Sequence, residues 1–172
     1  MKRLLALLFA MLILLTALPS YAEEIEPNES EILVEDGIAL TDEIIVEYGE
    51  VYYSKDEVAL YLYAFGELPP NYIKKNAAMD LGWDSRLGNL WDVAPGACIG
   101  GDSFGNRESR LPKARGRRYF ECDVNYEGGY RASERLIFSN DGLIYYTADH
   151  YETFTLLYDG WYDADTWYED AA

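Results

Sequence analysis

The segment ERLIFSNDGLIYYT, residues 134–147, contains two runs of strand-forming residues joined by a turn sequence. Branched and aromatic side chains dominate residues 134–139 and 142–147, as is typical of β-strands. The tripeptide Asn-Asp-Gly at 140–142 lies between the runs, and Asp-Gly favours the left-handed backbone conformations of a tight hairpin turn. The segment therefore predicts an antiparallel β-hairpin.

Strand-like runs also occur on both sides of this hairpin. They lie around residues 98–103, 118–124 and 153–157, and turn-forming residues such as Gly, Pro, Asn and Asp separate them. Together with the hairpin, they predict an antiparallel sheet in the second part of the chain.

Helical signals precede these strands. Ser54 is followed three residues later by Glu57, the spacing of a capping box, in which the two side chains bind amides of the first helical turn. Apolar residues then recur with helical spacing up to Gly66, a residue suited to end a helix. We expect helices over 55–65, near 74–80 and near 89–93. Helices followed by strands indicate an α+β fold, with N-terminal helices packed on a twisted antiparallel sheet of about five strands.

Charge is distributed unevenly along the 172 residues, whose net charge is -17. Residues 23–50 contain eleven Asp or Glu and residues 158–172 contain five, and neither segment contains Lys or Arg. Residues 51–157 contain 15 acidic and 12 basic residues. Acidic flanks of this kind are usually solvated tails. The alternative is a tethered polyanion that screens a basic site.

The first 22 residues have the pattern of a secretory signal peptide. A basic start is followed by an apolar run over 4–18 and by a small-x-small cleavage site, Ser-Tyr-Ala, at 20–22. We therefore expect a secreted, extracellular protein that is not held in a membrane after cleavage. The predicted organisation is a signal peptide (1–22), an acidic pro-segment or N-terminal extension (23–50), a folded domain (51–157) and an acidic, aromatic C-terminal extension (158–172).

The two cysteines, Cys98 and Cys122, would be allowed to form a disulfide in an exported protein. If Glu121 and Asp102 face the same side of the sheet, strand alternation places the cysteines on opposite faces, unless a bulge at 100–101 changes the alternation. We therefore expect free thiols. A single histidine and scattered carboxylates do not give metal-ligand spacing, so neither a metal nor another cofactor is expected.

His150 is the only histidine, and it lies near a strand end after the hairpin. Because an imidazole exchanges protons near neutral pH, His150 is the first candidate for proton transfer. The alternative is a structural or surface histidine. A cysteine–histidine protease or a glycosidase using Asp102 and Glu108 fits less well, because neither explains the basic residues of the middle segment.

Several cations of that segment suit an anionic substrate. Arg131 and Arg135 would share a face if both lay on one strand. A guanidinium group can donate two parallel hydrogen bonds to the oxygens of one phosphate. Beside such cations Glu121 would remain ionised and would serve as a base, with His150 as the acid. A carboxylate, an imidazole and a cationic clamp suit phosphoryl transfer without a metal. The alternative for each arginine is an ordinary surface ion pair.

Longer stretches carry a resemblance to a known family. They are LPPNYIKKNAAMDLGW (68–83), GNLWDVAPG (88–96), IGGDSFGNRESRLP (99–112), GRRYFECDVNY (116–126), GYRASERLIFSNDGLIY (129–145) and TADHYETFT (147–155). Through them, residues 51–157 resemble the barnase-like microbial extracellular ribonucleases, which prefer guanosine. The resemblance implies the microbial ribonuclease fold. It also implies metal-independent cleavage of single-stranded RNA by transesterification to a 2′,3′-cyclic phosphate, followed by hydrolysis to a 3′-phosphate.

The resemblance also implies a role for individual positions. Glu121 matches the general base and His150 the general acid. The positions that match groups around the scissile phosphate are Lys75, Arg131, Arg135 and Tyr151. The positions that match the guanine-binding loop are Phe104, Gly105, Asn106, Arg107 and Glu108. In that loop Glu108 would accept hydrogen bonds from the guanine edge, and the backbone amides of Asn106 and Arg107 would meet the guanine carbonyl.

Some positions depart from the family pattern. Gly105 replaces a serine of the guanine loop, and Phe120 replaces a basic residue before the expected base. Lys74 replaces a threonine that caps the second helix, and Gly66 replaces a histidine that interacts favourably with the dipole of the first helix. None of these changes removes an expected catalytic group.

The resemblance implies two partners, an RNA substrate and a barstar-like inhibitor protein in the producing cell. We expect a monomer. The alternative to an active enzyme is a catalytically weak RNA-binding or protein-interaction module that its acidic flanks hold inactive.

Overall fold

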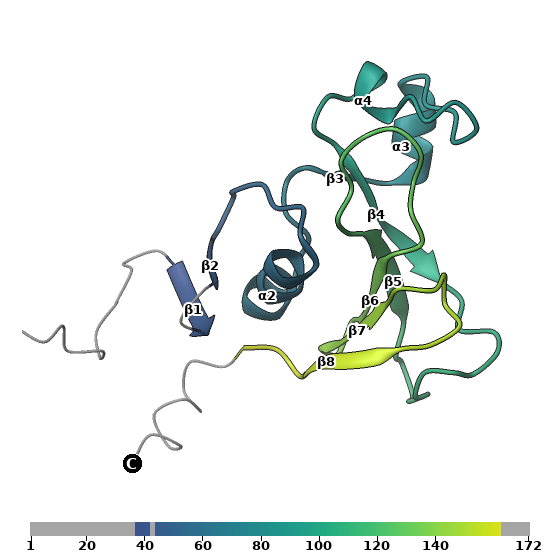
Figure 1. Cartoon of the computed structure of the whole chain (residues 1–172). Coiled ribbons are helices and arrows are strands. Elements are labelled where there is room, and N and C mark those ends of the chain that lie inside the picture. The colour runs from purple at the N-terminus through teal and green to yellow at the C-terminus, as the bar shows by residue number, and fades with distance from the viewer. Residues whose placement is uncertain (1–36, 42–43, 163–172) are drawn as a thin grey trace, which may run out of the picture. The chain divides into compact units, whose positions relative to one another are not determined.

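The computed structural model describes residues 37–41 and 44–162 (Figure 1). The expected signal peptide (1–22), the start of the acidic N-terminal extension and residues 163–172 lie outside the described residues. None of the described helices is long and apolar enough to cross a membrane.

A six-stranded sheet forms the centre of the fold. Its strands are β3 (Tyr72–Ile73), β4 (Cys98–Phe104), β5 (Tyr119–Asp123), β6 (Arg135–Ser139), β7 (Leu143–Thr147) and β8 (Thr155–Asp159), arranged in that order. From β4 to β8 each strand is antiparallel to its neighbour, whereas β3 is parallel to β4. The sequence predicted the five antiparallel strands to within two residues at each end. It did not predict β3, because two residues are too few to show a periodic pattern.

The described helices are α2 (Lys55–Phe65), α3 (Lys75–Asp80) and α4 (Leu90–Val93), as the sequence predicted. The capping box of α2 is present: the Glu57 amide donates to Ser54 Oγ, and the Ser54 amide donates to the Glu57 carboxylate, each at 3.3 Å. At its other end Gly66 adopts a left-handed conformation (φ 71°) and donates to the Leu62 carbonyl at 2.9 Å. Helix α2 is therefore fixed at both ends by local contacts.

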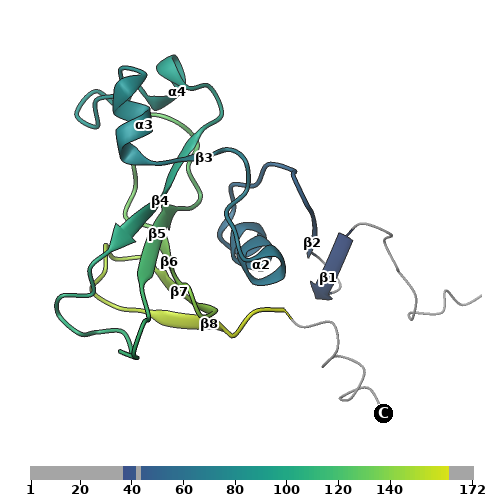
Figure 2. The ribbon, with the colours of Figure 1, turned by 180° about the vertical axis from the view of Figure 1, so that it is seen from behind.

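The main core lies between α2 and one face of the sheet (Figure 2). Val58 and Leu62 of α2 are buried in one cluster with Cys122, Leu136 and Ile144 of β5, β6 and β7. Side chains alternate between the two faces along each strand. The neighbours of these core residues along the strands therefore point to the opposite face, where the candidate site lies.

Part of the acidic N-terminal segment packs on α2. Strand β1 (Gly37–Thr41) pairs with β2 (Ile44–Glu47), and both lie on the side of α2 away from the sheet (Figure 1). Val46 is fully buried against Leu60 and Tyr61 of the helix. The Tyr61 hydroxyl also accepts a hydrogen bond from the Gly49 amide at 3.0 Å. The contacts of α2 therefore include Val46 and Gly49, which belong to the expected N-terminal extension, 23–50.

Both cysteines are buried and free, as expected, but strand β4 contains the bulge that the prediction had left open as an alternative. The register slips by one residue between Gly100, which pairs with Cys122, and Asp102, which pairs with Glu121. This bulge puts Cys98 on the same face as Gly100, two residues away, and hence on the face of Cys122. The two thiols are diagonal neighbours across the strands, which is farther apart than a disulfide normally allows. Gly100 is required here, because a Cβ at that position would lie 2.6 Å from the Cys122 Cβ.

We predict that Val46→Ala lowers the free energy of unfolding by about 1–3 kcal/mol, because it removes buried methyl groups from the contact with α2. Urea unfolding measures the change. The matched control is Ile45→Ala, whose side chain is 42% exposed, and its effect is expected to stay within about 0.5 kcal/mol. Equal effects of the two substitutions would contradict the packing of β2 on α2.

Candidate functional site

The candidate site lies on the face of the sheet opposite α2. Cys122 points into the core below α2, so its neighbours Glu121 and Asp123 point to the other face. Both carboxylates are nevertheless buried, with 8% of Glu121 and 2% of Asp123 exposed. Buried carboxylates need ion pairs and hydrogen bonds, and each has its own set of cationic or hydroxyl partners.

Glu121 is held between Lys75 and Tyr151. Its Oε1 atom forms a short ion pair with the Lys75 ammonium group, and its Oε2 atom accepts a hydrogen bond from the Tyr151 hydroxyl at 2.7 Å. Burial raises the pKa of Glu121, but the hydrogen bonds from Lys75 and Tyr151 and the charges of Lys75 and Arg131 outweigh it. The net result is a pKa below the ordinary value for glutamate, so Glu121 is ionised at neutral pH.

Lys75 is positioned by the start of α3. Lys74, at the N-cap, makes no side-chain capping hydrogen bond, as its replacement of threonine suggested. Asp102 of β4 caps the helix instead, because its Oδ2 atom accepts from the Lys75 amide at 3.0 Å. The sheet therefore fixes the first residue of α3, whose side chain reaches Glu121.

Asp123 joins the two arginines of the site. Arg131 donates from Nε to Oδ2 and from Nη2 to Oδ1 of Asp123, each at 2.6 Å. The Nε atom of Arg135 lies 2.8 Å from Oδ1 of the same carboxylate, as a charge contact without a directed hydrogen bond. A second Arg135 nitrogen, Nη1, donates to the Glu134 carbonyl at 2.6 Å. Asp123 thus fixes both guanidinium groups at once.

The expectation that Arg131 and Arg135 share a face of one strand was wrong. Arg131 lies in the loop before β6, and only Arg135 belongs to that strand. They converge because both pair with Asp123, a residue that was not among the predicted site residues. One signal was available: Asp123 lies two residues from Glu121, and alternation along a strand places both on the same face.

His150 and Tyr151 lie in a tight turn after β7. Both have left-handed backbones, with φ values of 57° and 76°, which non-glycine residues rarely adopt. The Asp149 carboxylate holds the turn, because it accepts hydrogen bonds from the amides of Glu152 and Thr153 at 3.1 and 2.9 Å. Hydrogen bonds from the Thr153 hydroxyl and amide lower the pKa of Asp149 to about 2, so this anion persists in weak acid.

Tyr151 connects the histidine to the carboxylate. The His150 ring is exposed, and its centroid lies 4.8 Å from that of Tyr151, whose hydroxyl binds Glu121. The other side of the site is formed by Phe104, whose ring centroid lies 5.3 Å from that of Tyr151. Tyr151 thus contacts both expected proton-transfer residues and Phe104, the first residue of the expected guanine-binding loop.

The loop that follows β4 borders a pocket of about 760 Å³. Its lining includes all five residues of the expected guanine-binding loop, Phe104, Gly105, Asn106, Arg107 and Glu108, together with His150 and Tyr151. The Asn106 side chain shapes the loop, because it accepts from the Leu111 amide at 3.1 Å and donates to the Leu111 carbonyl at 2.8 Å. Glu108 is exposed and pairs with Arg110 at 2.6 Å.

The structure thus brings the predicted residues together in two connected groups. Glu121, Lys75, Arg131 and Arg135 lie on or beside the sheet, the loop and His150 line the pocket, and Tyr151 contacts both groups. In the described part of the chain, no group of three or more His, Cys, Asp or Glu residues could hold a metal ion. An ionised carboxylate, an exposed imidazole and fixed cations beside a pocket would allow acid–base chemistry on an anionic substrate.

Comparisons with known proteins place this region in a family. A family model described as ribonuclease matches residues 55–158. Proteins named ribonuclease from Bacillus intermedius and Bacillus pumilus are each 56% identical over 102 residues, which cover 59% of this chain and 63% of each relative. A ribonuclease from Heyndrickxia coagulans is also 56% identical over 102 residues, which cover 94% of its length. The chain thus spans less than two thirds of the two Bacillus proteins.

We predict that Asp123→Asn lowers the free energy of unfolding by about 3–5 kcal/mol, because it removes the anion that pairs with the buried Arg135 and the partly buried Arg131. Chemical denaturation at pH 7 measures this. The control is Glu127→Gln, which removes an exposed carboxylate with an expected effect within about 0.5 kcal/mol. An Asp123→Asn protein as stable as the parent would show that Asp123 does not hold the site together.

Proposed function

Because the chain belongs to the ribonuclease family, we propose that it is an endoribonuclease that prefers guanosine and cleaves single-stranded RNA. The observation that carries this proposal is the ionised Glu121, which Tyr151 links to His150 and to the pocket. RNA suits such a site because its 2′-hydroxyl is a built-in nucleophile next to the scissile phosphate. A base and an acid are then enough for cleavage.

In the proposed first step Glu121 removes the proton of the 2′-hydroxyl. Each of its oxygens keeps a lone pair beyond those bound by Lys75 and Tyr151. The 2′-oxygen then forms a bond to phosphorus while the bond to the 5′-oxygen breaks. His150, in its protonated form, gives a proton to the leaving 5′-oxygen. The products are a 2′,3′-cyclic phosphate and a free 5′-hydroxyl.

The second step uses the same groups in reverse. Neutral His150 removes a proton from water, and the water oxygen attacks the cyclic phosphate. The bond from phosphorus to the 2′-oxygen breaks, and Glu121, now protonated, returns its proton to that oxygen. The product is a 3′-phosphate, and both residues regain their initial protonation states. This mechanism involves no metal ion.

Charge on the reacting phosphate increases in both transition states. Arg131 and Arg135 are fixed by Asp123, and Lys75 is fixed by the start of α3, so these cations need little reorganisation to stabilise that charge. Guanidinium groups are well suited to the task, because they donate several hydrogen bonds in a rigid plane.

The pocket beside His150 supports the guanine preference. In the proposed complex the Glu108 carboxylate accepts hydrogen bonds from the guanine edge, in place of its contact with Arg110, and the amides of Asn106 and Arg107 donate to the guanine carbonyl. Gly105 is not needed for steric reasons. A Cβ there would lie 3.5 Å from the nearest atom, the Arg107 Cγ, so the glycine mainly adds backbone freedom.

The proposal also covers the setting of the enzyme. It includes export through the N-terminal signal sequence, action as a monomer, and control inside the producing cell by a barstar-like inhibitor protein. The alternative is a weak RNA-binding module held inactive by its acidic flanks. The packing of Val46 on α2 favours the enzyme, because it keeps the described part of the acidic N-terminal segment on the side of α2 away from the sheet.

We predict that the purified protein, in EDTA, converts a guanylyl dinucleotide to a 2′,3′-cyclic phosphate much faster than an adenylyl dinucleotide. His150→Ala and Glu121→Ala should each lower kcat/KM by roughly 10²–10⁴-fold, the usual contribution of a general acid or base. Chromatography of the products measures both rates and shows the cyclic intermediate.

Two controls make this result specific. Thermal unfolding shows whether each variant is folded, and Glu127→Ala alters an exposed carboxylate that does not line the pocket beside His150 and has no assigned role. Full activity in folded His150→Ala and Glu121→Ala proteins would rule out the proposed mechanism. Absence of cleavage by the parent protein would favour the binding-module alternative.

A further inference from the structure

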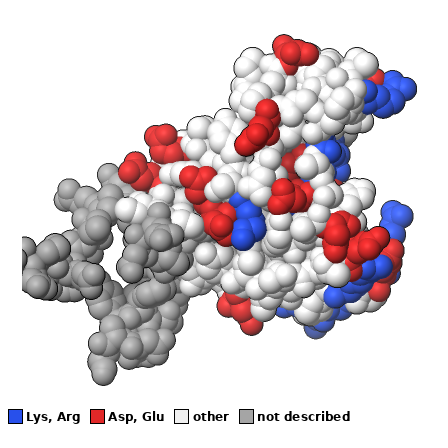
Figure 3. Space-filling view, viewed as in Figure 1, with Lys and Arg blue, Asp and Glu red and all other residues white. Residues whose placement is uncertain are grey.

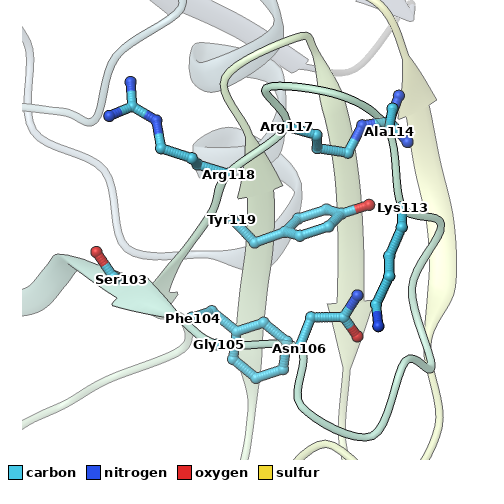
Figure 4. A pocket seen from close by; sticks show the side chains of 9 residues that line it. All are labelled: Ser103, Phe104, Gly105, Asn106, Lys113, Ala114, Arg117, Arg118 and Tyr119. Atoms are coloured by element: carbon cyan, nitrogen blue, oxygen red, sulfur yellow. The ribbon is translucent and has the colours of Figure 1, made fainter.

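A second pocket lies on the other side of the base-binding loop. Its volume is about 420 Å³, and residues 103–106 line both this pocket and the pocket that contains His150. The remaining wall comes from Lys113, Ala114 and residues 117–119, which lie at the start of β5 and in the segment before it (Figure 4). None of the proposed catalytic residues lines it. The two pockets are therefore neighbours that share the base-binding loop as a wall.

Two cations without carboxylate partners line this second pocket. Lys113 and Arg118 are exposed and lie on opposite sides of the Tyr119 ring (Figure 4). Among the described residues neither has an ion pair, and no Asp or Glu lines the pocket. Arg117, the third cation of the wall, is paired with Asp141 at 2.8 Å.

This arrangement is unusual for a chain with a net charge of -17. Figure 3 shows acidic side chains scattered over the visible face, including the part around α2, whereas most of the visible basic ones lie at the right of the view, away from α2. An acidic protein repels RNA at long range. Unpaired cations next to the site therefore supply much of the short-range electrostatic attraction for RNA phosphates.

The wall that carries the cations is held in place before any ligand binds. The Arg118 amide donates to the Asn140 side chain at 2.6 Å, and the Tyr119 hydroxyl donates to the Pro112 carbonyl at 2.7 Å. The Arg117–Asp141 ion pair ties the same segment to the β6–β7 turn. A preformed cationic pocket loses little conformational entropy when an anion binds.

We propose that this pocket binds backbone phosphates of the RNA strand on the 5′ side of the cleaved guanosine, through Lys113 and Arg118. The proposal rests on the function proposed above. The catalytic groups hold the phosphate on the 3′ side of that guanosine, and the loop holds its base. The strand that leaves the guanosine in the 5′ direction therefore passes beyond the loop, where the second pocket lies.

The test compares three substrates: a guanylyl-adenosine dinucleotide, the same dinucleotide with two uridines added on its 5′ side, and the same with two uridines added on its 3′ side. Lys113→Gln combined with Arg118→Gln should lower kcat/KM for the 5′-extended substrate by roughly 3- to 10-fold, the scale of one or two exposed charge contacts. The other two substrates should change less than about twofold. Arg115→Gln is the matched control, because it removes an exposed cation of the same loop that does not line the pocket.

A binding measurement separates this proposal from the proposed catalysis. A 5′-extended guanosine oligonucleotide with a 2′-O-methyl group at the guanosine cannot be cleaved. The logarithm of its binding constant should fall linearly with the logarithm of the salt concentration, and the slope should be less steep for the double variant. The two slopes should differ by about 0.7 for each phosphate that the removed cations neutralise in the parent protein. This slope can be measured even if the parent protein cleaves no RNA. Absence of cleavage would count against the proposed function, but it would not count against phosphate binding in this pocket.

Three results would overturn the inference. One is an unchanged rate on the 5′-extended substrate together with an unchanged salt slope. Another is an equal loss on all three substrates, which would indicate a general field effect. The third is faster cleavage by the double variant, which would mean that an acidic segment of this chain, not RNA, occupies the pocket.

Discussion

The alternation of side chains along β5 is the constraint on which this structure depends. Cys122 is buried under α2, and this fixes Glu121 and Asp123 on the other face. One strand thus contributes to the core and to the site. A slip of one residue would place two carboxylates in the apolar core and a thiol at the site, which is why register in such strands is strongly specified. Strand β4 matches this register through its bulge: Asp102 pairs with Glu121, and Gly100 pairs with Cys122.

The two buried carboxylates have different tasks. Asp123 accepts two hydrogen bonds from Arg131 and forms an ion pair with Arg135, so it positions both guanidinium groups. Glu121 has one cation and one hydroxyl as partners and keeps lone pairs that can accept further hydrogen bonds. Tyr151 then joins the sheet to the His150 turn, whose left-handed backbone is maintained by Asp149. Long-range pairings between β5, α3 and the turn after β7 therefore assemble the site.

Local patterns predicted the elements of the fold well. The capping box and Gly66 gave both ends of α2, and the Asn-Asp-Gly turn gave the β6–β7 hairpin. The proposed site residues came from family resemblance, and the structure brings them together around Tyr151. The roles of Asp123 and Asp149 could not be predicted as readily, because each acts through partners brought close only by folding. The bulge at 100–101 likewise changed the alternation on which the cysteine argument relied, and the packing of Val46 on α2 has no local signature.

The central claim is that Lys75 and Tyr151 keep Glu121 ionised so that it acts as the base. The most direct measurement is the pH dependence of kcat/KM on a guanylyl dinucleotide, for the parent protein and for Tyr151→Phe. The base must be deprotonated, so activity should fall on the acid side as pH drops through the pKa of Glu121, which lies below the ordinary value for glutamate. Loss of the Tyr151 hydrogen bond should raise that pKa and move the acid limb to higher pH. An acid limb that stays in place, or that moves to lower pH, would contradict the account.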